Sequence, residues 1–189
     1  MLALKNEEKD SLSSNQIKLK LKDYFPSVRI VTMSEMNKFS NLDEMFNSSN
    51  HVVLFTSTNS NNDGHWQTIF RTNNNLYFFD SYGKPPMYLI NLINKEIPNN
   101  KYHQTDAFGS LIANSEYFKS NRAYMNAFDY QRLAPQINDC GRYVVACLRL
   151  FSILKNNFDF EIMFEKMTEL KNELKLKTYD ETVTRITSG

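Results

Sequence analysis

Apolar residues recur at intervals of three and four in two stretches of the first fifty positions, which is the spacing of one helix face. These stretches are residues 18–25 and 34–46, and the β-branched run Val28-Arg-Ile-Val-Thr32 lies between them. We therefore expect a helix, a short strand and a second helix in this part of the chain.

Three runs rich in Val, Ile, Phe, Tyr and Thr follow, and these residue types favour strands. Asn-rich turns separate the runs. The sequence predicts strands at residues 51–58, 65–72 and 76–82. Beyond them we expect helices at 88–95 and 107–118 and a strand at 124–132.

The C-terminal third carries the strongest helical pattern of the chain. From residue 141 to residue 155 the apolar positions form one stripe at helical spacing, made by Val144, Val145, Leu148, Phe151 and Leu154. This stripe predicts a buried helix that begins immediately after Cys140. A more charged helix is expected at 160–177 and a loose end at 178–189, so that the fold class is α+β.

Composition narrows the functional classes. The chain has 189 residues, which suits one globular domain, with 22 basic and 21 acidic side chains and a net charge of +1. A net charge this small produces no overall electrostatic field that would attract nucleic acid or an anionic membrane. The N-terminus lacks the apolar run of a signal peptide, and Arg149 interrupts the longest apolar stretch. We expect a soluble, intracellular protein.

The two cysteines and three histidines limit the available chemistry. Cys140 and Cys147 are seven positions apart, so in one helix their Cα atoms would be separated by roughly 10.5 Å along the axis. This separation is too long for a disulfide. There is no Cys-x-x-Cys pair and no pair of histidines at ligand spacing. We expect neither a metal nor a cofactor.

Cys140 is the candidate nucleophile. A cysteine attacks as the thiolate, and the exposed amides and dipole of a helix N-terminus stabilise negative charge. Gly141 leaves space for an approaching carbonyl group, and the amides of Cys140 and Gly141 are candidate oxyanion donors. The alternative is a small buried residue that opens a core helix.

A thiolate mechanism also needs a base and a group that orients it. His65 begins a predicted strand, and Asp80 ends the next one. If Asn73 and Asn74 form a two-residue turn, facing positions sum to 147, and Asp80 faces Gln67 and is the diagonal neighbour of His65. A slip of one residue would send Asp80 to the other face. The alternatives are a structural histidine and a strand-end cap.

The other candidate residues near the site are weaker. His51 and His103 are expected at the surface. Trp66 is either a core aromatic residue or a wall of the site. For the oxyanion donor, a side-chain amide is needed. Gln136 lies four residues before Cys140 and Gln131 nine before it, and either is otherwise a loop glutamine.

Together these residues resemble a known family. His65-Trp66, Asp80 in an aromatic strand and Gln136-Ile-Asn-Asp-Cys-Gly141 at the head of an apolar helix are similar to the cysteine proteases that include the adenovirus maturation protease and SUMO-specific proteases. The order His, Asp, Cys matches that family and differs from papain, where Cys comes first. The run Cys-Gly-Arg-Tyr-Val-Val is most similar to the proteases of virophages, such as mavirus, and of Polinton-type elements.

The resemblance implies a papain-like α+β domain over residues 1–189, with a central, mostly antiparallel sheet and a buried helix headed by the nucleophile. Residues 1–50 would be an N-terminal helical or cap region, 51–155 the catalytic core, and 156–189 the C-terminal helix and tail. The family leaves six or seven residues between Gln and Cys, so both Gln136 and Gln131 stay candidates, with Gln136 preferred.

The implied function is that of a viral cysteine endopeptidase that uses His65, Asp80, Gln136 and Cys140, with Trp66 and Gly141 contacting the substrate. The implied substrate is a capsid or other virion precursor, in the host-cell cytoplasm or virus factory or packaged in the virion. Adenovirus-type proteases use DNA and a peptide activator, but the charge of +1 gives no support for strong DNA dependence. The alternatives are a protease that releases ubiquitin-like proteins, an acetyltransferase, and an inactive interaction or scaffold module.

Overall fold

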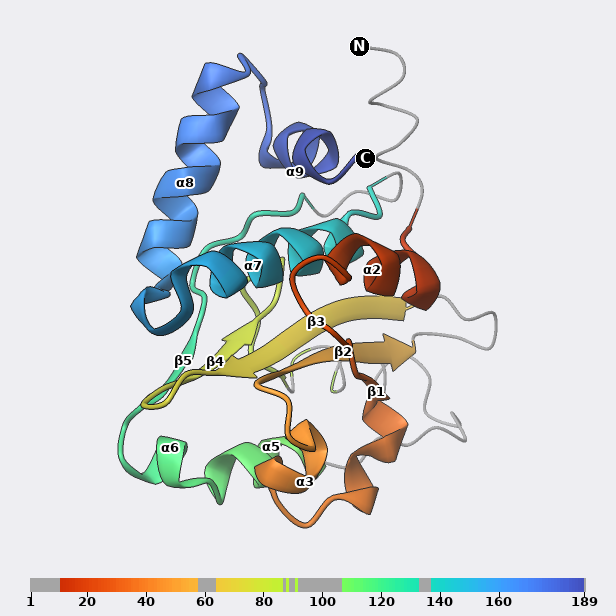
Figure 1. Cartoon of the computed structure of the whole chain (residues 1–189), viewed down its shortest axis with the longest axis vertical. Helices are drawn as coiled ribbons and strands as arrows, with labels where there is room; N and C mark the ends of the chain where they lie inside the picture. The colour runs from red at the N-terminus through yellow and green to blue at the C-terminus, as the bar shows by residue number, and fades with distance from the viewer. Residues whose placement is uncertain are drawn as a thin grey trace. The chain divides into compact units, whose positions relative to one another are not determined.

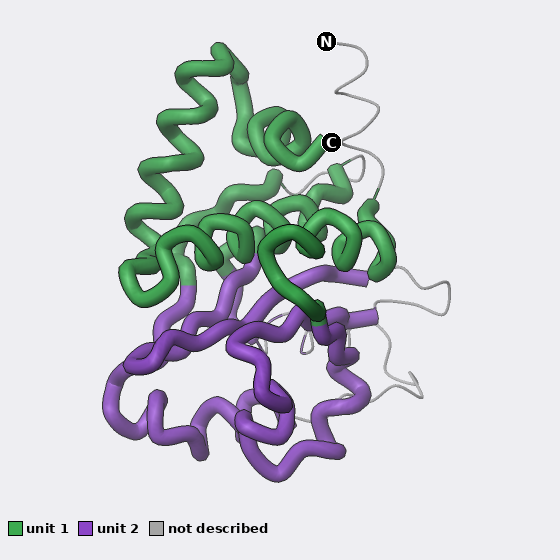
Figure 2. Tube along the Cα trace, in the orientation of Figure 1, with its two compact units in different colours: residues 1–28, 81–83, 126–189 green, residues 29–80, 84–125 purple. Residues whose placement is uncertain are grey.

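The computed structural model describes residues 11–57, 64–86, 88, 91, 107–132 and 137–188. The chain divides into two compact units (Figure 2). We call residues 29–80 and 84–125 the sheet unit, and residues 1–28, 81–83 and 126–189 the helical unit. Because strands and helices are both present and largely separate along the chain, the predicted α+β class is confirmed.

The sheet unit contains one five-stranded sheet whose order follows the sequence, β1-β2-β3-β4-β5. Its strands are β1 (Ile30–Thr32), β2 (His51–Ser57), β3 (Gly64–Arg71), β4 (Leu76–Phe79) and β5 (Ala123–Met125). The three central strands pair antiparallel through long ladders, whereas the short edge strands β1 and β5 pair parallel to their neighbours. The predicted run of three strands is therefore confirmed, in a sheet that is mixed at its edges.

Short helices of the sheet unit replace two longer helices that the sequence predicted. They are η1 (Met33–Lys38), α3 (Leu42–Phe46), α5 (Ala107–Ala113) and α6 (Glu116–Lys119). The expected helix at 34–46 is broken because Phe39 is extended and the side chain of Asn41 caps a new helix. The expected helix at 107–118 is broken in the same way by Ser115, whose hydroxyl accepts a hydrogen bond from the amide of Phe118.

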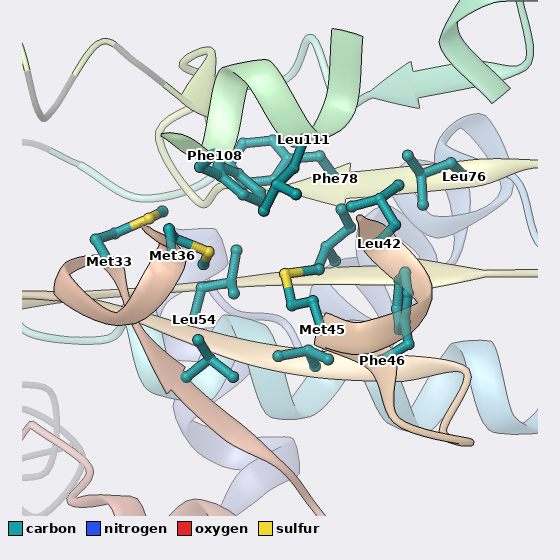
Figure 3. Close-up of a cluster of buried hydrophobic side chains, with 13 residues drawn as sticks. Met33, Met36, Leu42, Met45, Phe46, Leu54, Leu76, Phe78, Phe108 and Leu111 are labelled. Atoms are coloured by element: carbon teal, nitrogen blue, oxygen red, sulfur yellow. The ribbon is translucent and has the colours of Figure 1, made fainter. Parts of the chain in front are cut away.

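One face of the sheet packs against these helices and forms an apolar core (Figure 3). Side chains from η1, α3 and α5 point toward side chains from β2 and β4 (Figure 3). The labelled members of this cluster are Met33, Met36, Leu42, Met45, Phe46, Leu54, Leu76, Phe78, Phe108 and Leu111. Burial of this apolar surface anchors the strands from which the candidate site residues project.

The helical unit is built around the predicted buried helix, α7 (Cys140–Leu154) (Figure 1). Ten of its fifteen residues are buried, which makes it the centre of this unit. The other elements are α2 (Ser14–Leu21), η2 (Lys155–Asn157), α8 (Phe160–Glu173) and α9 (Tyr179–Thr187). Both α2 and α9 contact α7, and α8 contacts α9.

The expectation of a loose end at 178–189 is wrong. Residues Tyr179–Thr187 form α9, and Thr178 begins it with a capping box in which its hydroxyl and the Glu181 carboxylate bond each other's backbone amides. The helix buries a mostly polar face, in which Val183 is the apolar residue. Hydrophobic periodicity therefore gave no signal for it.

Other differences concern element ends. The first helix covers Ser14–Leu21 instead of 18–25, because Ser13 and Gln16 form a capping box at its start. The strand expected at 124–132 is limited to Ala123–Met125. The helix expected at 88–95 lies largely outside the described residues. The assignment of residues 1–189 to one protease domain stays a prediction.

Candidate active site

The predicted hairpin register brings three polar side chains together in the sheet unit. Strands β3 and β4 pair Thr68 with Phe79 and Arg71 with Leu76, so facing positions sum to 147 as expected. In this register Asp80 follows β4 on the face that His65 and Gln67 share. The same face carries the apolar core farther along the strands.

Asp80 accepts two short hydrogen bonds. His65 Nε2 lies 2.8 Å from Asp80 Oδ2, and Gln67 Nε2 donates to the same oxygen at 2.6 Å. The amide of Lys84 donates to Asp80 Oδ1 at 3.4 Å. Relative exposures are 5% for His65, 1% for Gln67 and 2% for Asp80. A carboxylate this buried requires such donors, because they replace the water that it has lost.

The imidazole of His65 is held through Nε2. A carboxylate accepts hydrogen bonds, so the neutral ring that bonds Asp80 carries its proton on Nε2 and has a lone pair on Nδ1. An imidazole held in this way by a carboxylate can act as a base through Nδ1, and this role of His65 stays a prediction.

Gln67 is a site residue that sequence reasoning did not assign. The turn at residues 73–74 predicts that Gln67 faces Asp80, and this pairing was the feature of the sequence that could have identified Gln67 as a site residue. Besides donating to Asp80, Gln67 accepts a hydrogen bond from Thr56 Oγ1 at 3.4 Å. The side chain thus connects β2 to the carboxylate that orients His65.

Trp66 and Gly64 flank the histidine on β3. The side chain of Trp66 alternates to the opposite face from His65 and packs on Phe55, with ring centroids 4.4 Å apart. A Cβ atom at Gly64 would overlap the Phe55 ring and the Thr56 carbonyl, so glycine permits this close approach of β2 and β3. A role of Trp66 in substrate binding stays a prediction.

Cys140 is the first residue of α7, as the sequence predicted. The first amides of a helix have no carbonyl partner within the helix, and they point toward the region of its first residue. Gly141 follows in the same turn and is buried. This placement offers backbone amides to a thiolate or to an oxyanion, and the catalytic roles of both residues stay predictions.

Cys147 occupies a different environment in the same helix. It is fully buried, and this burial raises the pKa of its thiol well above the usual value. Cys140 is 6% exposed. Of the two thiols, the one at the helix start is therefore the candidate for chemistry.

The two glutamine candidates differ in what the structure describes. Gln136 lies outside the described residues. Gln131 is buried, and its amide nitrogen donates to the hydroxyl of Tyr82 at 3.1 Å and to the carbonyl of Ile137 at 3.3 Å. Its amide oxygen accepts from Ser81 Oγ at 2.8 Å. These bonds occupy both hydrogens of the Gln131 amide, which favours Gln136 as the oxyanion donor.

The expectation that His51 is a surface residue is wrong. It is 3% exposed, and its Nδ1 lies 3.1 Å from both Ser49 Oγ and Asn50 Oδ1. His51 is buried because β2 is an inner strand of the sheet and pairs with β3 at this position. His103 lies outside the described residues.

Comparison with known proteins identifies a relative in a virophage. Over 191 aligned positions, which cover 99% of both chains, the sequence is 33% identical to "Uncharacterized protein V9" of Sputnik virophage. The chain belongs to the same family as this virophage protein. Membership in the V9 family extends over the whole described structure, because the alignment is almost complete. No model of a known protein family matches the chain.

A solved structure is also similar to the chain. It is the crystal structure of a de-sumoylating protease, aligned over 95% of this chain and 80% of its own length with 12% identity and a TM-score of 0.39.

The described residues also bear on metal sites and membranes. Within them, no three His, Cys, Asp or Glu side chains gather in a way that would hold a metal ion. None of the helices in the described part of this V9-family chain has the length and apolar character needed to cross a bilayer.

Proposed function

We propose that this protein is a cysteine endopeptidase in which Cys140 is the nucleophile, His65 the base and Asp80 the group that orients His65. The observation that carries the proposal is the buried 2.8 Å hydrogen bond between His65 Nε2 and Asp80 Oδ2, which the turn at residues 73–74 predicted from sequence. The position of Cys140 at the start of α7 supports it independently.

The reaction follows from these groups. His65 Nδ1 takes the proton of the Cys140 thiol, and the sulfur attacks the scissile carbonyl to form a tetrahedral oxyanion. The amides at the start of α7, with the side chain of Gln136, donate hydrogen bonds to this oxyanion. His65 then gives its proton to the leaving amine, so that an acyl-enzyme remains. Water attacks the acyl group, loses a proton to His65 and releases Cys140.

Asp80 and Gln67 act on the base. The hydrogen bond to Asp80 fixes the tautomer and the direction of the His65 ring, and the negative charge stabilises the imidazolium that forms during attack. Gln67 in turn holds Asp80 in place. Removal of a group that only orients the base is expected to lower kcat more than it raises KM.

The proposed substrate is a capsid or other virion precursor, cut beside a small residue such as Gly during particle maturation. Kinship with a Sputnik virophage protein supports a viral setting, and the resemblance of the sequence to adenovirus-type and virophage proteases supports this class of substrate. The net charge of +1 argues against strong dependence on DNA.

Co-expression with the major capsid protein of the same virus tests the proposal. We expect mass spectrometry to detect a shortened capsid protein with the wild-type chain and with Cys147→Ala, and full-length capsid protein with Cys140→Ala. The Cys147 variant is a matched control because it removes the other thiol of the same helix. Equal cleavage by Cys140→Ala and wild type would disprove the mechanism.

Two further reagents separate the alternatives. A nucleophilic Cys140 should react with iodoacetamide below pH 7 much faster than Cys147, whereas an inactive scaffold would show no such difference. Labelling of Cys140 by a ubiquitin-like protein with a C-terminal electrophile, with an unchanged capsid mass, would favour a deconjugating protease instead.

A further inference from the structure

The residue before the nucleophile is an aspartate that does not cap its own helix. Asp139 is the N-cap of α7, yet its side chain accepts no capping hydrogen bond from the backbone amides of the first turn. Its backbone angles, φ −90° and ψ 1°, also differ from the extended conformation of a usual N-cap. Among the α-helices whose N-caps the structure describes, the others do have a side-chain cap, and these N-caps are Ser13, Asn41, Ser115, Asp159 and Thr178.

The carboxylate of Asp139 is engaged with the C-terminal helix instead. Thr184 Oγ1 on α9 donates to Asp139 Oδ1 at 3.2 Å. The Nε atom of Arg142 lies 3.3 Å from the same oxygen, and Arg142 Nη1 donates to Thr187 Oγ1 at 3.4 Å. These side chains are all buried. An aspartate next to Cys140 in sequence is thus held by a residue 45 positions away.

Capping by Asp139 would oppose the proposed chemistry. An N-cap carboxylate normally accepts from the second or third amide of its helix, here Gly141 or Arg142. That bond would bring a negative charge to the helix start, where the Cys140 thiolate and the oxyanion require positive potential. The cap would also occupy an amide of the first turn that would otherwise be able to bond an anion.

We propose that Asp139 and Thr184 are positioning residues. Their hydrogen bond keeps the Asp139 carboxylate away from the backbone amides of the first turn of α7, so that these amides remain available to anions. The inference rests on the proposed function, since it concerns the anions formed during cleavage. It makes α9 a necessary part of the active enzyme, although α9 supplies no group to the reaction.

The hydrogen bond between Thr184 and Asp139 can be removed while α9 keeps its other contacts. Arg149 Nη1 donates to the carbonyl of Ile186 at 3.1 Å, and Lys20 Nζ donates to the carbonyl of Thr187 at 2.5 Å. Val183 is buried in the same helix.

Thr184→Val keeps the shape of the side chain and deletes only the donor to Asp139. The carboxylate is then able to turn back and cap α7.

The test compares Thr184→Val with Thr182→Val. Thr182 is equally buried on α9, but its hydroxyl donates to Thr178 O within its own chain segment, so that its replacement leaves Asp139 untouched. Cleavage of a capsid-derived peptide gives kcat and KM, and urea unfolding gives stability. We expect Thr184→Val to lower kcat about tenfold or more with KM unchanged, and to be no less stable than Thr182→Val. Thr184→Ser should restore kcat.

Each outcome decides one point. If wild type cleaves and Thr184→Val has the kcat of Thr182→Val, the positioning role is wrong and the proposed function stands. If Thr184→Val loses kcat only in proportion to a loss of folded protein, the role is merely structural and the inference is again overturned. If wild type cleaves no capsid-derived peptide, the proposed function fails and the inference falls with it.

Discussion

At the scale of single residues, the orientation of the candidate base His65 depends on the hydrogen bonds that the buried Asp80 carboxylate accepts. Asp80 has lost nearly all contact with water, and His65, Gln67 and the Lys84 amide provide its donors. Leaving a buried acceptor without a donor costs more than an average hydrogen bond contributes. The orientation of His65 is therefore sensitive to Gln67, a residue without acid–base chemistry of its own.

Replacing Gln67 by Leu should lower both stability and activity. The change removes the 2.6 Å donor to Asp80, and we expect the free energy of unfolding to fall by about 1–3 kcal/mol. Among the folded molecules kcat should also fall, because the carboxylate that orients His65 becomes mobile. Urea unfolding and peptide cleavage measure the two effects.

Thr68→Val is the matched control for Gln67→Leu. Thr68 lies next to Gln67 on β3 and donates to the carbonyl of Val52 at 2.9 Å, away from Asp80. Its replacement should cost a hydrogen bond and leave kcat unchanged. Equal kcat values for the two variants would contradict a role of Gln67 in orienting the base.

At the scale of elements, turn chemistry decides which side chains meet. The hydroxyl of Thr72 accepts hydrogen bonds from the amides of Asn74 at 3.3 Å and Asn75 at 3.0 Å, and Thr72 N donates to Asn75 O at 2.9 Å. These bonds close the hairpin in the register that places Asp80 on the face of His65. A slip of one residue would move Asp80 to the opposite face.

We expect Thr72→Val to destabilise this hairpin. It removes the acceptor of two backbone amides, and the free energy of unfolding in urea should fall by about 1 kcal/mol. Thr72→Ser keeps the hydroxyl and should keep most of the stability. A Val variant as stable as the Ser variant would show that the turn does not depend on this side chain.

At the scale of the whole molecule, burial shifts the pKa of several groups in the helical unit. Burial raises the pKa of Tyr143 well above its usual value, and the charges of Asp180 and Asp139 add to this effect. Burial also raises the pKa of Tyr130 and of Cys147. The folded protein thus keeps protons that the unfolded chain releases near pH 9–10. Stability from these groups is complete below this range and is lost as pH rises above it, toward the raised pKa values of the folded state.

Alkaline unfolding should therefore depend on Tyr143. Above about pH 10, each such proton contributes a slope of up to about 1.4 kcal/mol per pH unit to the loss of stability. Tyr143→Phe removes one of these protons and should make the decline of unfolding free energy with pH less steep. Tyr124→Phe, at an exposed position, should leave the slope unchanged. Identical slopes for both variants would contradict this account.

Much of the fold was predictable because its signals are local. The alternation of strands, the apolar stripe of α7 and the Asn-rich turn each lie within a few residues of what they determine. The register followed from the turn, and with it the pairing of His65 and Asp80. Asn41 and Ser115 cap new helices inside stretches of helical periodicity. A prediction from periodicity alone therefore gave one helix where the structure has two.

Local sequence signals sufficed for the three central strands, the register of β3 and β4 and the place of Cys140 at a helix start, because short-range geometry controls all three. The tertiary structure decided the burial of His51, the existence of α9 and the contact of Thr184 with Asp139. The helix α9 docks through a mostly polar face, which leaves no apolar period in the sequence. The partner of Asp139 is 45 residues distant, so that only the packing of α9 on α7 determines where its carboxylate lies.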